Sequence, residues 1–235
     1  MGEHTVSSFD TELNEIDRLI RQMGDTAGAM VASSIGALLK GDSAQGQRVV
    51  SEDAVMDAHQ RDLDDRAITL IAKRQPMAQD LRAVVGAIRM AGDLERIGDL
   101  AKNIAKRVGA VGQTSMPKNL SHGIDAMAGM VLEQVKGVVD KYDARDVAGL
   151  SELRDNDEKI DVRYTAVFRE LLTYMMEDPR NITACTHLLF CAKNLERIGD
   201  HVTNIAENAY YVVTGEQLPV ARPKYDETTA VLAGA

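Results

Sequence analysis

The chain has no tryptophan, only 4% aromatic residues, two cysteines and five prolines in 235 residues. Scarce aromatics disfavour a protein built on sheets, in which aromatic and β-branched side chains are enriched. Ala, Leu, Ile, Val and Met supply most of the 45% hydrophobic residues, and such side chains fill the contacts between helices. Because so few prolines interrupt long helical windows, the composition predicts an all-α protein.

Charge and cysteine placement exclude several classes of protein. A formal net charge of −9 lacks the basic surface that a phosphate backbone requires, so we expect no nucleic-acid partner. Cys185 and Cys191 fall in one expected helix about 9 Å apart along its axis, too far for a disulfide. The stretch MGEHTVSSFD shows no signal pattern, and no window approaches the roughly 18 apolar residues of a membrane span. We therefore expect a soluble, cytoplasmic protein.

Apolar residues at helical spacing predict three long helices in each half of the chain. Pro76 and Pro179 end the second helix of each half, and GAVGQTSMPKN at 109–119 separates the halves. Short connections make neighbouring helices antiparallel. We predict two tandem antiparallel three-helix bundles related by an internal repeat, in residues 1–112 and 113–214, with 215–235 an extended or disordered tail. The six expected helices are about 9–40, 44–74, 78–108, 118–141, 145–177 and 180–213.

The hexapeptide LERIGD occurs at residues 94–99 and again at 195–200, in the third helix of each half. At 100° per residue, one stripe of each helix is apolar and an acidic row lies on roughly the opposite side. We expect the apolar stripe to face the core and the acidic row to face outward. The stripes are Leu94, Ile97, Ala101, Ile104, Val108 and Leu195, Ile198, Val202, Ile205, Ala209; the rows are Glu95, Asp99, Asn103 and Glu196, Asp200, Asn204.

Carboxylates four residues apart on a helix repel and cost it about 0.2–0.5 kcal/mol, so we expect a cation to offset them. The second helices carry two more such pairs, and hairpin packing brings four carboxylates and an amide together in each half. Oxygen ligands alone suit Mg²⁺, Mn²⁺, Ca²⁺ or iron. The candidate metal ligands are Asp53, Asp57, Glu95 and Asp99 with Asn103, and Asp157, Asp161, Glu196 and Asp200 with Asn204.

The same pattern has a simpler interpretation as a solvated acidic face, with Arg96, Lys102 and Lys106 as ionic partners. In the dense run SEDAVMDAHQRDLDD, Glu52, Asp62 or Asp64 could take the place of the first aspartate pair. His201 directly follows Asp200 and points about 100° away from it, so we expect a solvated histidine there.

LERIGDLAKNIAKR and NLERIGDHVTNIAEN, preceded by IAKRQP and LLTYMMEDPRNI respectively, resemble the PhoU family of phosphate-uptake regulators over both halves. The resemblance implies two three-helix bundles whose ExxxD and DxxxD motifs bind metal clusters, with iron, manganese, magnesium or zinc as the ions. It also implies a non-enzymatic negative regulator that associates with the phosphate ABC transporter and a membrane histidine kinase. Contact with the membrane would then be through these partners only.

Two other functions compete with this interpretation. A carboxylate-bridged metal enzyme of the helical-bundle type would use Glu-x-x-His, but no glutamate stands three residues before any of the five histidines. A metal-free helical adaptor would dock its acidic face on a basic partner. We find no nucleophile–base constellation and no phosphate-cradling glycine-rich loop, which disfavours a hydrolase or kinase. The sequence leaves open the metal, a homodimer and direct sensing of phosphate.

Overall fold

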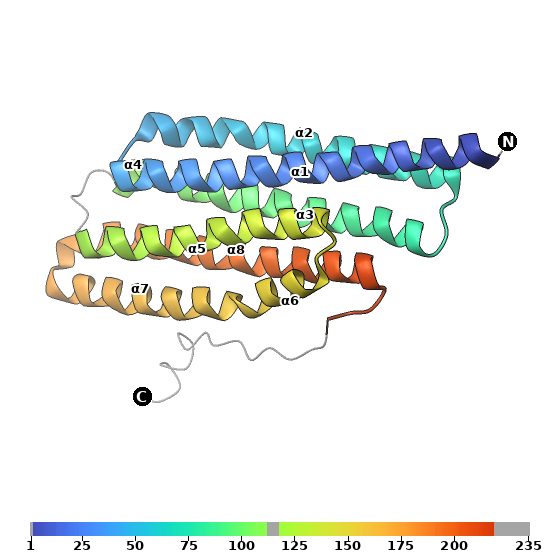
Figure 1. The fold of residues 1–235 in the computed structure, drawn as a ribbon. Helices are drawn as coiled ribbons and strands as arrows, with labels where there is room; N and C mark the ends of the chain where they lie inside the picture. The colour runs from blue at the N-terminus through green and yellow to red at the C-terminus, as the bar shows by residue number, and fades with distance from the viewer. Residues whose placement is uncertain (1, 112–117, 219–235) are drawn as a thin grey trace.

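The computed structural model describes residues 2–111 and 118–218, and in these ranges every regular element is a helix (Figure 1). This confirms the all-α prediction. The first half comprises α1 (Gly2–Lys40), α2 (Ser43–Arg74), α3 (Gln79–Ala105) and the short α4 (Val108–Val111). The second half comprises α5 (Lys118–Asp143), α6 (Val147–Asp155), α7 (Asp157–Glu177), the 3₁₀ turn η1 (Pro179–Asn181) and α8 (Ile182–Thr214).

The first turn of each half uses the same local chemistry. The Asp42 carboxylate accepts a hydrogen bond from the Gln45 N–H at 2.9 Å, and the Asp146 carboxylate accepts one from the Gly149 N–H at 3.0 Å. Such a cap satisfies a backbone donor that the first helical turn leaves free. The residue before each aspartate has a positive φ, which reverses the chain direction. The internal repeat therefore extends to its turns.

The predicted helix 145–177 is divided at Asn156, so the prediction of one uninterrupted helix was wrong there. The Lys159 N–H bonds to the Asn156 carbonyl three residues earlier, at 3.1 Å, which tightens the local turn. The Asn156 side chain also accepts from the Lys159 ammonium at 2.7 Å. Short polar side chains compete for hydrogen bonds in this way and disfavour helix interiors.

The segments predicted to be irregular are described only in part. Val108 and Val111 are buried, and the four residues of α4 continue into the predicted break as helix. Gly215, with φ of 81°, ends α8, and the nearby Leu218 is buried. Residues 112–117 and 219–235, which hold the middle of the predicted break and most of the predicted tail, lie outside the described residues, and the last two residues of the break begin α5.

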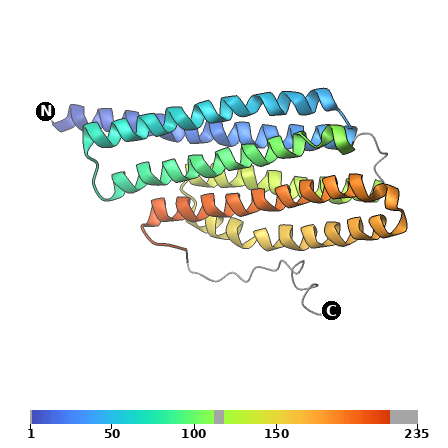
Figure 2. The ribbon, with the colours of Figure 1, turned by 180° about the vertical axis from the view of Figure 1, so that it is seen from behind.

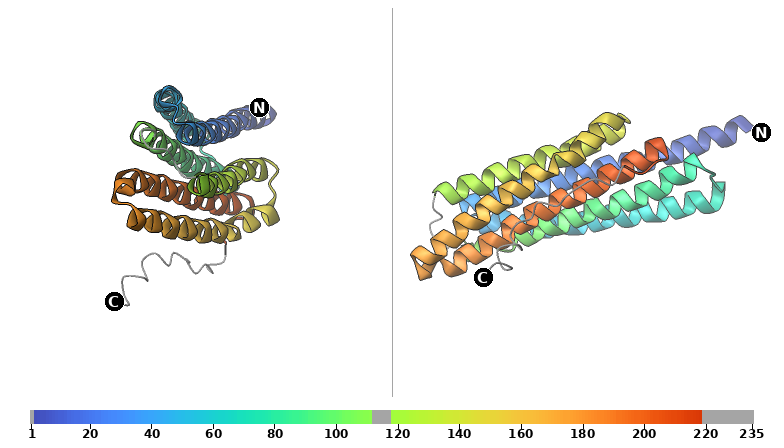
Figure 3. Two further views of the ribbon diagram at one scale, coloured as in Figure 1. Left: turned by 90° about the vertical axis from the view of Figure 1, so that its left-hand side faces the viewer. Right: turned by 90° about the horizontal axis from the view of Figure 1, so that it is seen from below.

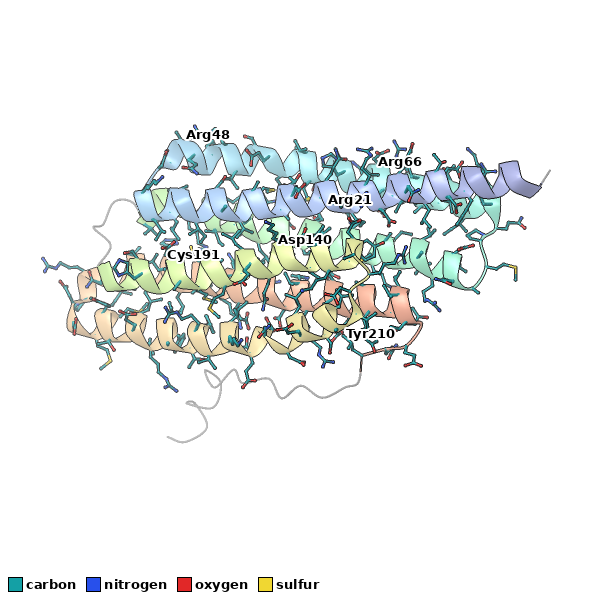
Figure 4. All side chains as sticks on the ribbon, viewed as in Figure 1. Arg21, Arg48, Arg66, Asp140, Cys191 and Tyr210 are labelled. Atoms are coloured by element: carbon teal, nitrogen blue, oxygen red, sulfur yellow. The ribbon has the colours of Figure 1, made fainter. Side chains whose placement is uncertain are left out.

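The two halves pack side by side through α3 and α8, and α1 also packs on α5. Figure 1 shows α1–α3 above α5–α8, and the rear view in Figure 2 shows α3 beside α8. The end view in Figure 3 shows the two sets of helices stacked on one another. Arg21 of α1, labelled in Figure 4, forms an ion pair with Asp143 of α5. None of the helices in the described part of the chain is long and apolar enough to cross a membrane.

Glycines bring the two halves into close contact. A Cβ added to Gly86 of α3 would lie 2.1 Å from Val212 Cγ2 of α8, and one added to Gly24 of α1 would lie 2.4 Å from Val139 Cγ2 of α5. Both distances are far inside van der Waals contact, so larger residues here would push the halves apart. The buried apolar side chains of both halves form one continuous cluster.

The apolar stripes are buried as predicted, from Leu94 to Val108 and from Leu195 to Ala209. The expectation that both acidic rows face outward was wrong for Glu196, which is only 6% exposed. The reason is the position of α8, which packs against α3, α5, α6 and α7. A helix surrounded in this way has little surface left for solvent.

Candidate metal centres

The first acidic group lies between α2 and α3, as predicted for a hairpin. Its members, Asp53 and Asp57 on α2 with Glu95 and Asp99 on α3, are called here the first quartet. The Lys102 ammonium donates to Asp53 Oδ2 at 2.7 Å and to Asp99 Oδ1 at 2.5 Å, and so joins the two helices. All three of these side chains are mostly buried.

The pKa of Glu95 indicates that the four acids of the first quartet lie near one another. Burial raises the pKa of its carboxyl, and the negative charge of Asp99 raises it further, as do those of Asp57 and Asp53. Arg96 lowers it, with Nε at 3.3 Å from Glu95 Oε2 and Nη1 at 3.2 Å from Asp99 Oδ2. The four carboxylates therefore share one electrostatic environment that contains two cationic side chains.

The second acidic group lies between α7 and α8 and is more deeply buried. Its members, Asp157 and Asp161 on α7 with Glu196 and Asp200 on α8, are called here the second quartet. Asp157 is 1% exposed and Asp161 is 6% exposed. A Cβ added to Gly199 would lie 2.5 Å from Asp157 Oδ1, so the glycine of this LERIGD copy makes room for an aspartate.

Glu196 of the second quartet is buried near other acids and a lysine. Burial raises the pKa of its carboxyl, Lys193 lowers it, and Asp200 and Asp161 raise it. Its Oε1 accepts from the Lys193 ammonium at 2.8 Å. Its Oε2 is buried and has no hydrogen-bond partner among the described residues. A buried carboxylate oxygen without a donor is costly, and a bound cation would satisfy it.

The two asparagines differ from the acids. The Asn204 amide donates to Asp93 Oδ1 of α3 at 3.3 Å, across the seam between the halves. His201 Nδ1 lies 2.9 Å from the same oxygen, so the prediction of a purely solvated His201 was wrong. Asn103 is exposed on α3. The sequence could not indicate Asp93, because its partners lie 108 and 111 positions away in the other half.

The alternative residues for the first aspartate pair lie elsewhere. Asp62 pairs with Arg66 one turn along α2, with Arg66 Nε at 2.9 Å from its Oδ1. Asp64 stands seven residues beyond Asp57, about 10 Å along the helix, and burial raises its pKa. Glu52 is exposed. The Lys102 bond to Asp53, and the effect of the Asp53 and Asp57 charges on the pKa of Glu95, favour the pair Asp53 and Asp57.

The quartets provide suitable donor atoms for a metal ion, although their present spacing does not form a closed site. Within residues 2–111 and 118–218, no three Asp, Glu, His or Cys side chains converge closely enough to hold one ion. In the first quartet two carboxylates bond to Lys102, and in the second Glu196 bonds to Lys193. Carboxylate oxygens in the described quartets, one of them buried without a donor, fit a hard cation such as Mg²⁺ or Mn²⁺.

Comparison with known proteins gives consistent matches over both halves. A family model described as the PhoU domain matches residues 20–108 and 124–209. The phosphate-specific transport system accessory protein PhoU homolog of Rhizobium meliloti (strain 1021) is 54% identical over 228 residues, covering 97% of this chain and 96% of that protein. The accessory protein PhoU of Escherichia coli (strain K12) is 32% identical over 235 residues, covering 100% and 96%. The crystal structure of PhoU from Pseudomonas aeruginosa matches with a TM-score of 0.85 at 32% identity, covering 88% of this chain and 100% of that one.

Proposed function

The chain belongs to the PhoU family, and from this premise we propose that it is an accessory protein of a phosphate-specific transport system that restrains phosphate uptake and the phosphate-starvation response. The observation that carries this proposal is the 54% identity, over nearly the full length of both chains, to a protein named for that role. The proposed partners are the phosphate ABC transporter and a phosphate-sensing histidine kinase, which the protein contacts from the cytoplasm without catalysing a reaction.

Charge supports action by docking. A formal net charge of −9 favours association with basic surfaces and speeds it at low ionic strength. We therefore expect binding to the transporter and kinase to weaken as salt is added.

We propose further that each quartet holds metal. Asp53, Asp57, Glu95 and Asp99 would provide the ligands in the first half, and Asp157, Asp161, Glu196 and Asp200 those in the second, with Asn103 and Asn204 as outer candidates. When bound, iron, manganese, magnesium or zinc would supply positive charge between two helices of a hairpin. The carboxylates would then fix α2 against α3 and α7 against α8, and so shape the surface of these two helix pairs, called here the docking face.

The regulatory role is tested by deletion and complementation. Deleting the gene should derepress the phosphate-starvation response in phosphate-rich medium, and the full-length chain should restore repression. A chain with Glu196→Ala and Asp200→Ala should restore it less well, whereas Glu207→Ala, an exposed change on the same helix, should restore it fully. Normal repression in the deletion strain would reject the regulatory role, unless a second copy of the gene is present.

Metal binding is tested by elemental analysis of tag-free protein, with and without chelator. Changing Glu95 and Asp99 to Ala should remove roughly half of the bound metal, because only one of two quartets is altered, and should leave the helical circular dichroism signal nearly unchanged. A metal-free adaptor is the second candidate, favoured by the lysines that already bond to quartet members. Absence of metal from active protein would select it.

A further inference from the structure

One lysine ammonium sits in each quartet. Lys102 donates to Asp53 and Asp99, which come from two helices. The distances from its Nζ are 2.7 Å to Asp53 Oδ2 and 2.5 Å to Asp99 Oδ1. Hydrogen bonds therefore hold the Lys102 ammonium between two of the acids that the proposed function assigns to metal.

The second quartet has a lysine in a different position. The Lys193 ammonium bonds to Glu196 Oε1 at 2.8 Å and lies 5.0 Å from the centre of the Tyr164 ring on α7. It thus reaches from α8 toward α7, as Lys102 reaches from α3 toward α2. A cation over an aromatic face gains additional attraction, which helps to hold the side chain in place.

The two lysines are not copies of one another in the internal repeat. Lys102 stands three residues after Asp99, and the matching place after Asp200 holds Thr203. Lys193 stands three residues before Glu196, and the matching place before Glu95 holds Gly92. The lysine therefore follows the acids in the first half and precedes them in the second. Because both halves have a lysine although its position is not repeated, the positive charge is required by the acids.

We propose that Lys102 and Lys193 are internal counter-ions that compete with metal for the quartets, so that a metal ion enters only as the lysine leaves. This inference rests on the proposed metal binding. Mg²⁺ binds oxygen at about 2.0–2.1 Å, and the ammonium of Lys102 already lies 2.5–2.7 Å from two of the same oxygens. Two cations cannot share these atoms without strong repulsion.

The lysine side chain is suited to such an exchange. Its ammonium is a compact, strongly hydrated charge on a flexible stem, so it can swing from the quartet into water when a metal ion arrives. Metal binding would then have two effects on the docking face. It would place a metal ion between the helices, and it would release a positively charged side chain to the surface.

The test measures Mn²⁺ binding to the full chain by isothermal titration calorimetry, and its melting temperature in EDTA. Lys102→Met and Lys193→Met remove each ammonium and keep most of the apolar stem. Each variant should bind Mn²⁺ roughly 10- to 100-fold more tightly at one site, the factor expected when a competing hydrogen bond to a charged group is lost. Each should also melt at a lower temperature in EDTA, and added Mn²⁺ should reverse that loss.

Lys106 lies one turn beyond Lys102 and is exposed. Lys106→Met is therefore the matched control and should change neither the Mn²⁺ affinity nor the melting temperature in EDTA. If a Met variant fails to fold, Lys102→Gln and Lys193→Gln remove the charge but retain an amide donor. Mn²⁺ binding that is unchanged or weaker in the lysine variants would overturn the competition and leave metal binding itself intact. No binding to the wild type or to any variant would overturn both. Binding to the variants alone would support the competition.

Discussion

Changing Glu196 to Gln tests the second quartet most directly. The Glu196 side chain is buried and its Oε2 has no hydrogen-bond donor among the described residues. Such a buried, unsatisfied group costs about 1–3 kcal/mol, or more when it is charged. Glutamine has the same shape, its oxygen can still accept from Lys193, and its amide can donate toward the neighbouring acids. In EDTA the variant should therefore be more stable than the wild type.

The expected size is measurable. A gain of about 1–3 kcal/mol raises the melting temperature of a chain of this length by about 2–4 °C for each kcal/mol. Saturating Mn²⁺ should reduce the difference, because a ligand at about 100 times its Kd adds roughly 2.7 kcal/mol to the protein that binds it. The glutamine variant, with one charged ligand fewer, should gain less. The experiment is thermal unfolding followed by circular dichroism, with Glu207→Gln as an exposed control on α8.

Two results would refute this reasoning. A lower melting temperature of Glu196→Gln in EDTA would show that both carboxylate oxygens are satisfied in the folded protein. An equal rise with Mn²⁺ in the wild type and the variant would show that Glu196 is not a metal ligand.

Three further predictions follow from burial elsewhere in the chain. Burial, and next the charge of Asp65, raises the pKa of Asp64 above its usual 3.8. The stability that Asp64 contributes is therefore fully present below pH 3.8 and is lost as the pH rises through the pKa of the folded protein. Asp64→Asn should raise the melting temperature at pH 7 and not near pH 3. Burial raises the pKa of Cys185, and that of Cys191 to about 12, so iodoacetamide at pH 8 should label Cys191 rapidly only after unfolding in guanidinium, as read by mass spectrometry. A fragment of residues 118–215 should be helical and melt cooperatively, but at a lower temperature than the whole chain because the face of α8 that packs on α3 becomes exposed; a fragment unfolded in dilute buffer would show that the halves are one folding unit.

Much of the fold was predictable because helices are set by local spacing. The period of apolar residues fixes which face of a helix is buried, and the stripes led by Leu94 and Leu195 are buried as expected. Pro76 and Pro179 marked the hairpin turns correctly. The close approach of Gly86 to Val212 could not be predicted, because the apolar pattern of one helix does not identify its partner in another half of the chain.

The depth of burial was harder to predict than the position of the acids. Spacing placed Glu95 and Glu196 alike, opposite an apolar stripe, and implied that both face solvent. In the structure α8 has neighbours on several sides, and Glu196 is buried while Glu95 keeps partial exposure. The residue pattern of one helix identifies its most apolar face, but it does not show how many other helices pack against the remaining faces.

The two copies of LERIGD show why acids and their counter-charges differ in predictability. Acids four residues apart share a helix face, so spacing and hairpin packing together predict which acids lie near one another. A lysine can reach an acid of its quartet from three residues after it, as Lys102 reaches Asp99, or from three residues before it, as Lys193 reaches Glu196. Both placements bring the ammonium to an acid, because neighbours three apart share a helix face. Sequence indicated Lys102 as a partner within an acidic face, and only the structure reveals that Lys193 bonds to Glu196 in the second half.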